Sequence, residues 1–243
     1  MKHGHTTPEA PLLAFAAHPD DIEFSCGGVV ARETQSGRPA HFVICSRGEA
    51  ASNGTSEIRR VETENAAAIL GASQELLLLD GDAKLEMRTA HTLKIARIVR
   101  RIRPAVILAP SLVANQHPDH ARLGTIVRDA ARLARFGGLD DLRGAPPYSV
   151  DHLLYYASSP DSQPTNCTRI FFDVSAPEVL TAWKSAMEAH ESQMKTRNYV
   201  ELHLAMARTN GLSAGVEYAI ALFSDDPILV DSLKQLGRSS RRF

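Results

Sequence analysis

The chain alternates short apolar runs with amphipathic stretches, and the first apolar run ends in an unusual polar cluster. Residues 12–17 are all apolar and are followed at once by His18, Pro19, Asp20 and Asp21. A run of six is too short for a membrane span or an isolated helix, but it is typical of a strand buried on both faces. We therefore predict a strand whose carboxyl end carries one histidine and two carboxylates.

Three further apolar runs predict strands at 40–45, 75–79 and 105–109. Helical spacing or helix boundary signals mark the segments between and after them. The predicted helices cover 25–36, 55–71, a segment carrying Ile95 to Ile102 that stops at Pro104, and a segment from Pro118 to Leu133. Strand and helix thus alternate four times, which indicates an α/β fold with a Rossmann-like, mostly parallel sheet covered by helices on both faces.

The second half of the sequence is less regular. Strands are predicted at 150–157 and 168–174, a helix at 176–190, a further helix after Tyr199, and an extended or turn-like stretch at 216–223. No linker, repeat or low-complexity segment divides the chain, so we expect a single domain over 1–243. Residues 1–10 are expected to be a mobile arm, and 237–243 a basic tail.

Composition excludes several classes of partner. A formal net charge of -1 gives no reason to expect nucleic acid or an acidic membrane surface. The three cysteines are far apart in the sequence, which favours a reducing compartment over a disulfide framework. No apolar run approaches the roughly 18 residues that a membrane span requires. Residues 1–11 do not show the positively charged region and apolar stretch that are typical of a signal peptide. We expect a cytoplasmic protein without membrane contact.

A second polar cluster, His117 to His120, follows the strand at 105–109, so two strand ends deliver three histidines and three aspartates. One such cluster alone is a common turn motif. Two clusters at the carboxyl edge of one sheet favour a metal site instead, because ligands gather at that edge. One imidazole and one carboxylate from the first cluster, with one imidazole from the second, would hold zinc and leave a position open for water. Asp20 and His117 then remain for proton transfer.

Several short motifs together resemble a known family. They are Ala17-His18-Pro19-Asp20-Asp21 with Gly27-Gly28, Gly48-Glu49 with Asn53-Gly54-Thr55 and Arg59, His117-Pro118-Asp119-His120, and Gly215-Val216-Glu217-Tyr218. This set resembles the PIG-L/LmbE-like zinc deacetylases over nearly the whole chain. Within that family the chain is most similar to the N-acetylglucosaminyl malate deacetylases of bacillithiol synthesis.

The resemblance assigns roles to individual residues. It implies that His18, Asp21 and His120 bind one Zn²⁺ per chain, with Fe²⁺ as another divalent ion that could fill the site. It makes Asp20 the general base, His117 the group that polarises the amide or protonates the leaving amine, and Asp119 the carboxylate that orients His117. Tyr199 falls where the family has a tyrosine thought to reach the oxyanion. Arg59, Glu49, Asn53 and Gln116 would contact the substrate. The family also includes hexamers, so we expect a homo-oligomer.

The expected function is therefore hydrolysis of the acetamide of an N-acetylglucosaminyl conjugate such as the malate glycoside. Relatives that act on the malate conjugate often carry an arginine where this chain has Gln116. Two alternatives stay open. One is a deacetylase of another N-acetylglucosamine substrate, such as a chito-oligosaccharide, and the other is a non-catalytic sugar-binding protein on the same fold. Dinucleotide binding is disfavoured, because no GxGxxG motif follows the first strand.

Overall fold

A single sheet organises the protein in the computed structural model, which describes residues 9–114 and 117–239. The strands are β1 (Leu12–Ala16), β2 (Ala40–Ile44), β3 (Ala72–Leu76), β4 (Val106–Pro110), β5 (His152–Tyr156), β6 (Thr168–Asp173) and β7 (Ala219–Ser224). Their order across the sheet is β3-β2-β1-β4-β5-β7-β6. The first five strands pair in parallel, whereas β7 is antiparallel to both β5 and β6. The expected mostly parallel sheet is confirmed.

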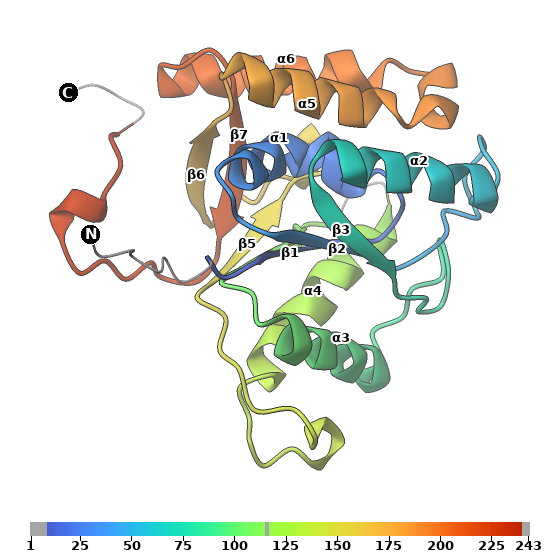
Figure 1. The fold of residues 1–243 in the computed structure, drawn as a ribbon, viewed down its shortest axis with the longest axis vertical. Coiled ribbons are helices and arrows are strands. Elements are labelled where there is room, and N and C mark those ends of the chain that lie inside the picture. The colour runs from blue at the N-terminus through green and yellow to red at the C-terminus, as the bar shows by residue number, and fades with distance from the viewer. Residues whose placement is uncertain (1–8, 115–116, 240–243) are drawn as a thin grey trace, which may run out of the picture.

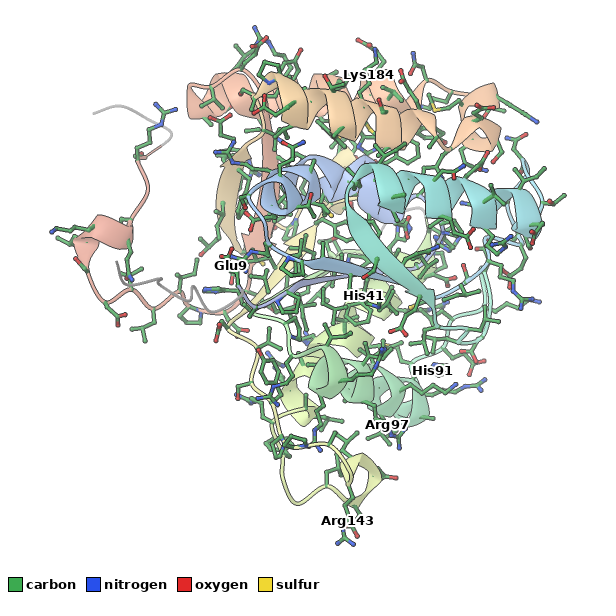
Figure 2. The ribbon with its side chains drawn as sticks, in the orientation of Figure 1. Glu9, His41, His91, Arg97, Arg143 and Lys184 are labelled. Carbon is green, nitrogen blue, oxygen red and sulfur yellow. The ribbon has the colours of Figure 1, made fainter. Side chains whose placement is uncertain are left out.

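Helices cover both faces of this sheet, as Figure 1 shows. The helices are α1 (Asp21–Gln35), α2 (Ser56–Ile69), α3 (Thr89–Ile102), α4 (Pro118–Leu133), α5 (Pro177–Glu188) and α6 (Tyr199–Ala214). Helices α3 and α4 lie on one face. Helices α1 and α2 lie on the other face, with α5 and α6 stacked beyond them. The long loop between α4 and β5 extends away from the sheet, below α3 in the view of Figure 2. The figure labels Arg97 on α3 and Arg143 in this loop.

The apolar run in β1 serves two hydrophobic cores at once. Leu12, Ala14 and Ala16 belong to the core beneath α1 and α5, whereas Leu13 and Phe15 belong to the core beneath α3 and α4. Alternate side chains of a strand point to opposite faces, so a central strand needs apolar residues at every position. This requirement explains why the run in β1 is continuous rather than alternating.

Three local predictions differ from the structure. Helix α1 begins at Asp21 rather than at residue 25, so this aspartate stands at the first turn of the helix. Strand β3 lies at Ala72–Leu76, three residues before the predicted start of 75, because its register is set by pairing with β2. In α2 the repeated apolar positions Ile58, Val61 and Ile69 are exposed, and the side chains that face the core are small or polar.

The order of the strands brings the two polar clusters together. Strand β1 has β2 on one side and β4 on the other. The connections that leave β1 and β4 therefore run in opposite directions along the sheet, and a crevice opens between them at the carboxyl ends. Both clusters lie at this point. No helix in the described part of the chain combines the length and the apolar character that crossing a membrane requires.

Candidate active site and metal centre

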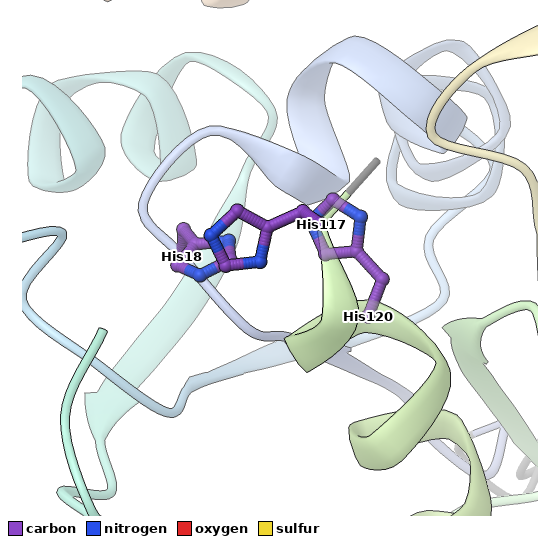
Figure 3. A group of neighbouring side chains, drawn as sticks. All are labelled: His18, His117 and His120. Carbon is purple, nitrogen blue, oxygen red and sulfur yellow. The ribbon is translucent and has the colours of Figure 1, made fainter. Parts of the chain in front are cut away.

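The two clusters meet, although they lie about a hundred residues apart in the sequence. His18 follows β1, Asp21 opens α1, and His117 caps α4 by accepting the Asp119 N–H on its Nδ1 atom at 3.4 Å. The ring centroid of His18 lies 4.2 Å from that of His117 and 5.2 Å from that of His120. Figure 3 shows the three rings gathered between the first turns of α1 and α4.

The geometry of His18, Asp21 and His120 fits a divalent metal ion. Asp21 places Oδ1 3.0 Å from His120 Nε2 and Oδ2 3.5 Å from His18 Nδ1. One possible ligand atom from each of His18, His117 and His120 lies within 4.8 Å of the other two. A second such group among the described residues consists of His18, Asp82, His117 and Asp119. Neighbouring ligands of a tetrahedral zinc with bonds of about 2.0–2.1 Å are themselves about 3.3 Å apart. Small side-chain movements would suffice to enclose an ion.

Carboxylates crowd around His18 and change its pKa. Burial by itself lowers the pKa of His18, but Asp21, Asp119 and Asp82 outweigh burial and raise that pKa to about 12. The pKa of Asp21 lies well below its usual range, since the charges of His120 and His18 outweigh the effect of burial. The site therefore concentrates negative charge around its imidazoles, as a cation site requires.

Asp20 has a strained backbone and a fixed carboxylate. Its φ of 101° is in the left-handed region, which an aspartate rarely adopts. Arg59 Nη2 donates to Asp20 Oδ2 at 3.0 Å and to the Pro19 carbonyl at 2.6 Å, and its Nη1 donates to the Gly48 carbonyl at 3.0 Å. A Cβ atom at Gly48 would lie 1.9 Å from Arg59 Nη1, so only glycine leaves room for this guanidinium. Burial raises the pKa of Asp20 to about 6, against the lowering effect of Arg59.

A cavity of about 460 Å³ opens over these groups. Its lining comprises His18, Asp20, Asp21, Phe24, Ser25, Ala50, Ala51, Ser52, Arg59, Asp82, Ala83, His117, His120, Ser158, Gln193, Tyr199 and His203. Arg59 is the one lysine or arginine among these described lining residues, and its guanidinium is already engaged with Asp20. The cavity therefore offers hydroxyl, amide and carboxylate groups, together with imidazoles, rather than a free basic side chain.

Most residues that the sequence singled out lie in or beside this cavity. Tyr199 lines it. Glu49 and Asn53 do not, because the neighbouring residues 50–52 form the wall instead. The carboxylate of Asp119 lies 3.5 Å from His18 Nε2, so it stands beside a predicted metal ligand. Gln116 lies outside the described residues.

The site also contains residues that the sequence motifs do not single out. Asp82 lies 3.0 Å from His18 Nε2 and 3.5 Å from His117 Nε2, and Ser158 Oγ lies 2.9 Å from His120 Nδ1. Asp82 comes shortly after the apolar residues 76–79, so the rule that drew attention to His18, a polar side chain after an apolar run, could have found it. Phe24, Gln193 and His203 carry no comparable local signal, because they reach the cavity from α1 and from the distant segment 190–203.

Other histidines stand outside the cluster, among them His41 on β2 and His91 on α3, both labelled in Figure 2. His41 shares a hydrogen bond with Ser73 Oγ at 2.8 Å. His190 is fully buried 3.6 Å from Glu23, and His203 packs against the ring of Phe24 in the cavity wall. Burial and the charge of Arg197 lower the pKa of His203 to about 4.

Comparison with known proteins adds independent information. The model of the family named PIG-L, described as GlcNAc-PI de-N-acetylase, matches residues 13–131. The diacetylchitobiose deacetylase of Thermococcus kodakarensis is 29% identical over 75% of this chain and 69% of its own length. The 4-oxalmesaconate hydratase of Pseudomonas putida is 26% identical over 86% of this chain and 82% of its own length.

Among solved structures, the conserved protein TT1542 from Thermus thermophilus superposes with a TM-score of 0.81. It is 34% identical, and the alignment covers 91% of this chain and 97% of that one. The matched family region contains both polar clusters and Asp82. The likeness therefore includes the residues that surround the candidate metal position.

Proposed function

Because this chain belongs to the PIG-L family of de-N-acetylases, we propose that it is a divalent-metal-dependent deacetylase that hydrolyses the acetamide of an N-acetylglucosamine unit in a small conjugate. One observation carries the proposal. His18, Asp21 and His120 converge at the floor of an open cavity, with the carboxylate of Asp20 beside them. Zinc is the metal that we expect there, because two imidazoles, one carboxylate and an open side are typical of catalytic zinc.

His18, Asp21 and His120 would hold the metal, which supplies Lewis acidity and makes a water nucleophile available near neutral pH. The chain's own groups then position charge and protons. Asp20, fixed by Arg59, accepts the proton of the attacking water. His117 and Tyr199 line the same cavity, where they would donate hydrogen bonds to the oxygen that becomes negative. Asp20 or His117 returns a proton to the leaving amine.

For the remainder of the substrate, we favour a neutral sugar over a malate glycoside. Recognition of a free carboxylate normally uses an arginine or lysine. Among the described lining residues, Arg59 is committed to Asp20 and to two backbone carbonyls. Sugar hydroxyls instead suit the polar side chains of Ser52, Ser158 and Gln193 in the wall.

The similarity to a hydratase makes hydration of an unsaturated carboxylate the second candidate function. The charge of the described lining disfavours it, since a mesaconate derivative carries carboxylates and the cavity already contains Asp20 and Asp82. A non-catalytic sugar-binding role is disfavoured for a different reason. Sugar binding alone does not require a strained, partly buried carboxylate beside a cluster of imidazoles.

Acetate release tests the proposal. The zinc-loaded protein is incubated with diacetylchitobiose, N-acetylglucosaminyl malate and a mesaconate-type acid, with and without chelator. We expect chelator-sensitive acetate release from the first substrate, less from the second, and no hydration of the third. Asp20→Ala should retain metal but lose activity by on the order of 100-fold or more, because the general base is absent. No acetate from either sugar, or full activity in Asp20→Ala, would contradict the proposal.

A further inference from the structure

Asp82 occupies a junction between separate parts of the site. It lies in the connection from β3 to α3 and is 4% exposed. Its Oδ1 atom lies 3.0 Å from His18 Nε2 and 3.5 Å from His117 Nε2. Its Oδ2 atom accepts the backbone N–H of Ala50 at 3.0 Å. One carboxylate thus contacts the connections that follow β1, β2 and β4.

We propose that Asp82 is the positioning carboxylate of this site: it orients His18 toward the metal and ties the substrate-facing loop 46–55 to the same imidazole. The proposal rests on the metal-dependent function proposed above. It assigns Asp82 no contact with the ion itself.

The two nitrogen atoms of His18 face different partners. Nδ1 faces Asp21 at 3.5 Å, on the side of the candidate metal position, and Nε2 faces Asp82. A neutral imidazole carries one proton, and a carboxylate beside one nitrogen holds the proton there. Nε2 has no hydrogen-bond partner among the described residues, but Asp82 Oδ1 lies 3.0 Å from it, so a small rotation of the ring would direct the Nε2 proton at Asp82. Nδ1 would then be the nitrogen that gives up its proton to bind a metal. Such partners fix both the tautomer and the ring orientation of a metal-binding histidine.

His120 is arranged in the same way. Its Nε2 atom faces Asp21, and Ser158 Oγ lies 2.9 Å from Nδ1 on the far side of the ring. Each predicted histidine ligand thus has a polar partner behind it. Asp119 also approaches His18 Nε2, but at 3.5 Å, and Arg122 lies 3.5 Å from its other oxygen. Asp82 is thus the nearer of two carboxylates beside His18 Nε2, and both raise the pKa of His18.

The second oxygen of Asp82 extends this role to the cavity wall. Ala50, whose N–H it accepts, precedes Ala51 and Ser52, and all three line the cavity. Gly81, the preceding residue, has a φ of +97°, and a Cβ atom there would lie 2.5 Å from Glu49 Oε1. Glycine at 81 therefore lets the 46–55 loop pack closely against the loop that carries Asp82.

A metal-affinity measurement on the chain of residues 1–243 tests this role without a substrate. The metal-free wild type, Asp82→Asn, Asp119→Asn and Asp80→Asn are titrated with Zn²⁺ against a chromogenic chelator, and with Co²⁺ to record the ligand-field spectrum. Asp80→Asn is the matched control, since Asp80 is in the same loop but contacts Glu86, Arg88 and His91 instead. Asparagine at 82 can still accept the Ala50 N–H, so the loop should remain folded.

We expect Asp82→Asn to bind Zn²⁺ about 10–100-fold more weakly than wild type, as is usual when the partner of a metal-binding histidine is lost. Asp119→Asn should lose less, Asp80→Asn should stay within about twofold, and the Co²⁺ spectrum should change in Asp82→Asn. Affinity within twofold of wild type in Asp82→Asn, an equal loss in Asp80→Asn, or two Zn²⁺ ions per wild-type chain would overturn the inference. The last result would make Asp82 a ligand.

Two further outcomes keep the test decisive. If circular dichroism shows that Asp82→Asn is unfolded, Asp82→Glu replaces it, because the longer side chain cannot keep both the His18 and the Ala50 contacts. Wild-type affinity in Asp82→Glu would also overturn the inference. A wild-type protein that binds no divalent metal would contradict the proposed function, whereas normal metal binding that ignores residue 82 would contradict this inference alone.

Discussion

The contacts of single residues decide which imidazoles can bind a metal at the candidate position beside Asp21. His117 and His120 are both within reach of His18, so distance alone leaves two possible histidine sets. Contacts with carboxylates separate them. His120 contacts Asp21, whereas His117 lies beside Asp82 on the opposite side of the His18 ring.

We expect His120→Ala to lose stoichiometric zinc and His117→Ala to retain it while losing deacetylase activity. The reason is that removing one of three protein ligands leaves a weak site, whereas His117 is predicted to act on the substrate. Metal analysis after gel filtration, combined with acetate release, measures both effects. Loss of zinc in His117→Ala would instead indicate a site of three histidines.

His203 gives a prediction for stability at low pH. Burial, together with Arg197, lowers its folded-state pKa to about 4, whereas its ordinary value is 6.5. The unfolded chain therefore binds more protons between these values, and His203 removes stability as pH falls from 6.5 toward 4. We expect wild type to lose on the order of 2 kcal/mol more than His203→Phe between pH 7 and 4.5. Urea unfolding of both proteins measures this difference, and parallel pH curves would contradict it.

At the scale of elements, hydrogen bonds join α2 to the segment between α5 and α6, which leads to Tyr199 at the start of α6. Glu62 on α2 accepts the Ser192 N–H and the Ser192 hydroxyl, both at 2.7 Å. Gln193 Nε2 donates to the Asn53 carbonyl at 2.9 Å. These bonds hold a short helical turn at Glu191–Lys195 against the cavity. They also explain why α2 directs polar side chains inward and leaves Ile58, Val61 and Ile69 exposed.

Glu62→Gln should therefore lower the free energy of unfolding by about 1–3 kcal/mol, because one of two charge-assisted hydrogen bonds is lost in a buried place. KM should rise as well, because Gln193 in this turn and Tyr199 just after it both line the cavity. Chemical denaturation and steady-state kinetics measure the two effects. Glu64→Gln is the matched control. This residue pairs with Arg60 on the exposed side of α2, where ion pairs contribute little. Equal effects in both variants would contradict the role of Glu62.

For the whole molecule, the candidate metal position joins connections that leave different strands. His18 and Asp21 belong to the β1–α1 connection, His120 to the first turn of α4, and Asp82 to the β3–α3 connection. A ligand that binds only the folded chain stabilises all of it. The homo-oligomer expected from the family resemblance stays a prediction, which light scattering after gel filtration would check.

We expect removal of the metal to lower Tm. At free zinc about 100 times its Kd, binding contributes about 2.7 kcal/mol. For a chain of this length, that corresponds to a Tm difference of roughly 5–10 °C. Differential scanning calorimetry with and without chelator measures the difference. The His120→Ala protein serves as control, since chelator should leave its Tm unchanged, and an unchanged Tm in wild type would contradict the prediction.

The sequence by itself determined the alternation of strands and helices and the positions of the two polar clusters. Both follow from local patterns. A buried strand requires an apolar run, and the polar residues that follow such a strand lie at the edge of the sheet. Tertiary structure alone decided that β7 runs antiparallel between β5 and β6, that Arg59 holds Asp20, and that Asp82 stands behind His18. These contacts join residues far apart in the sequence, and their partners are set by sheet order and packing.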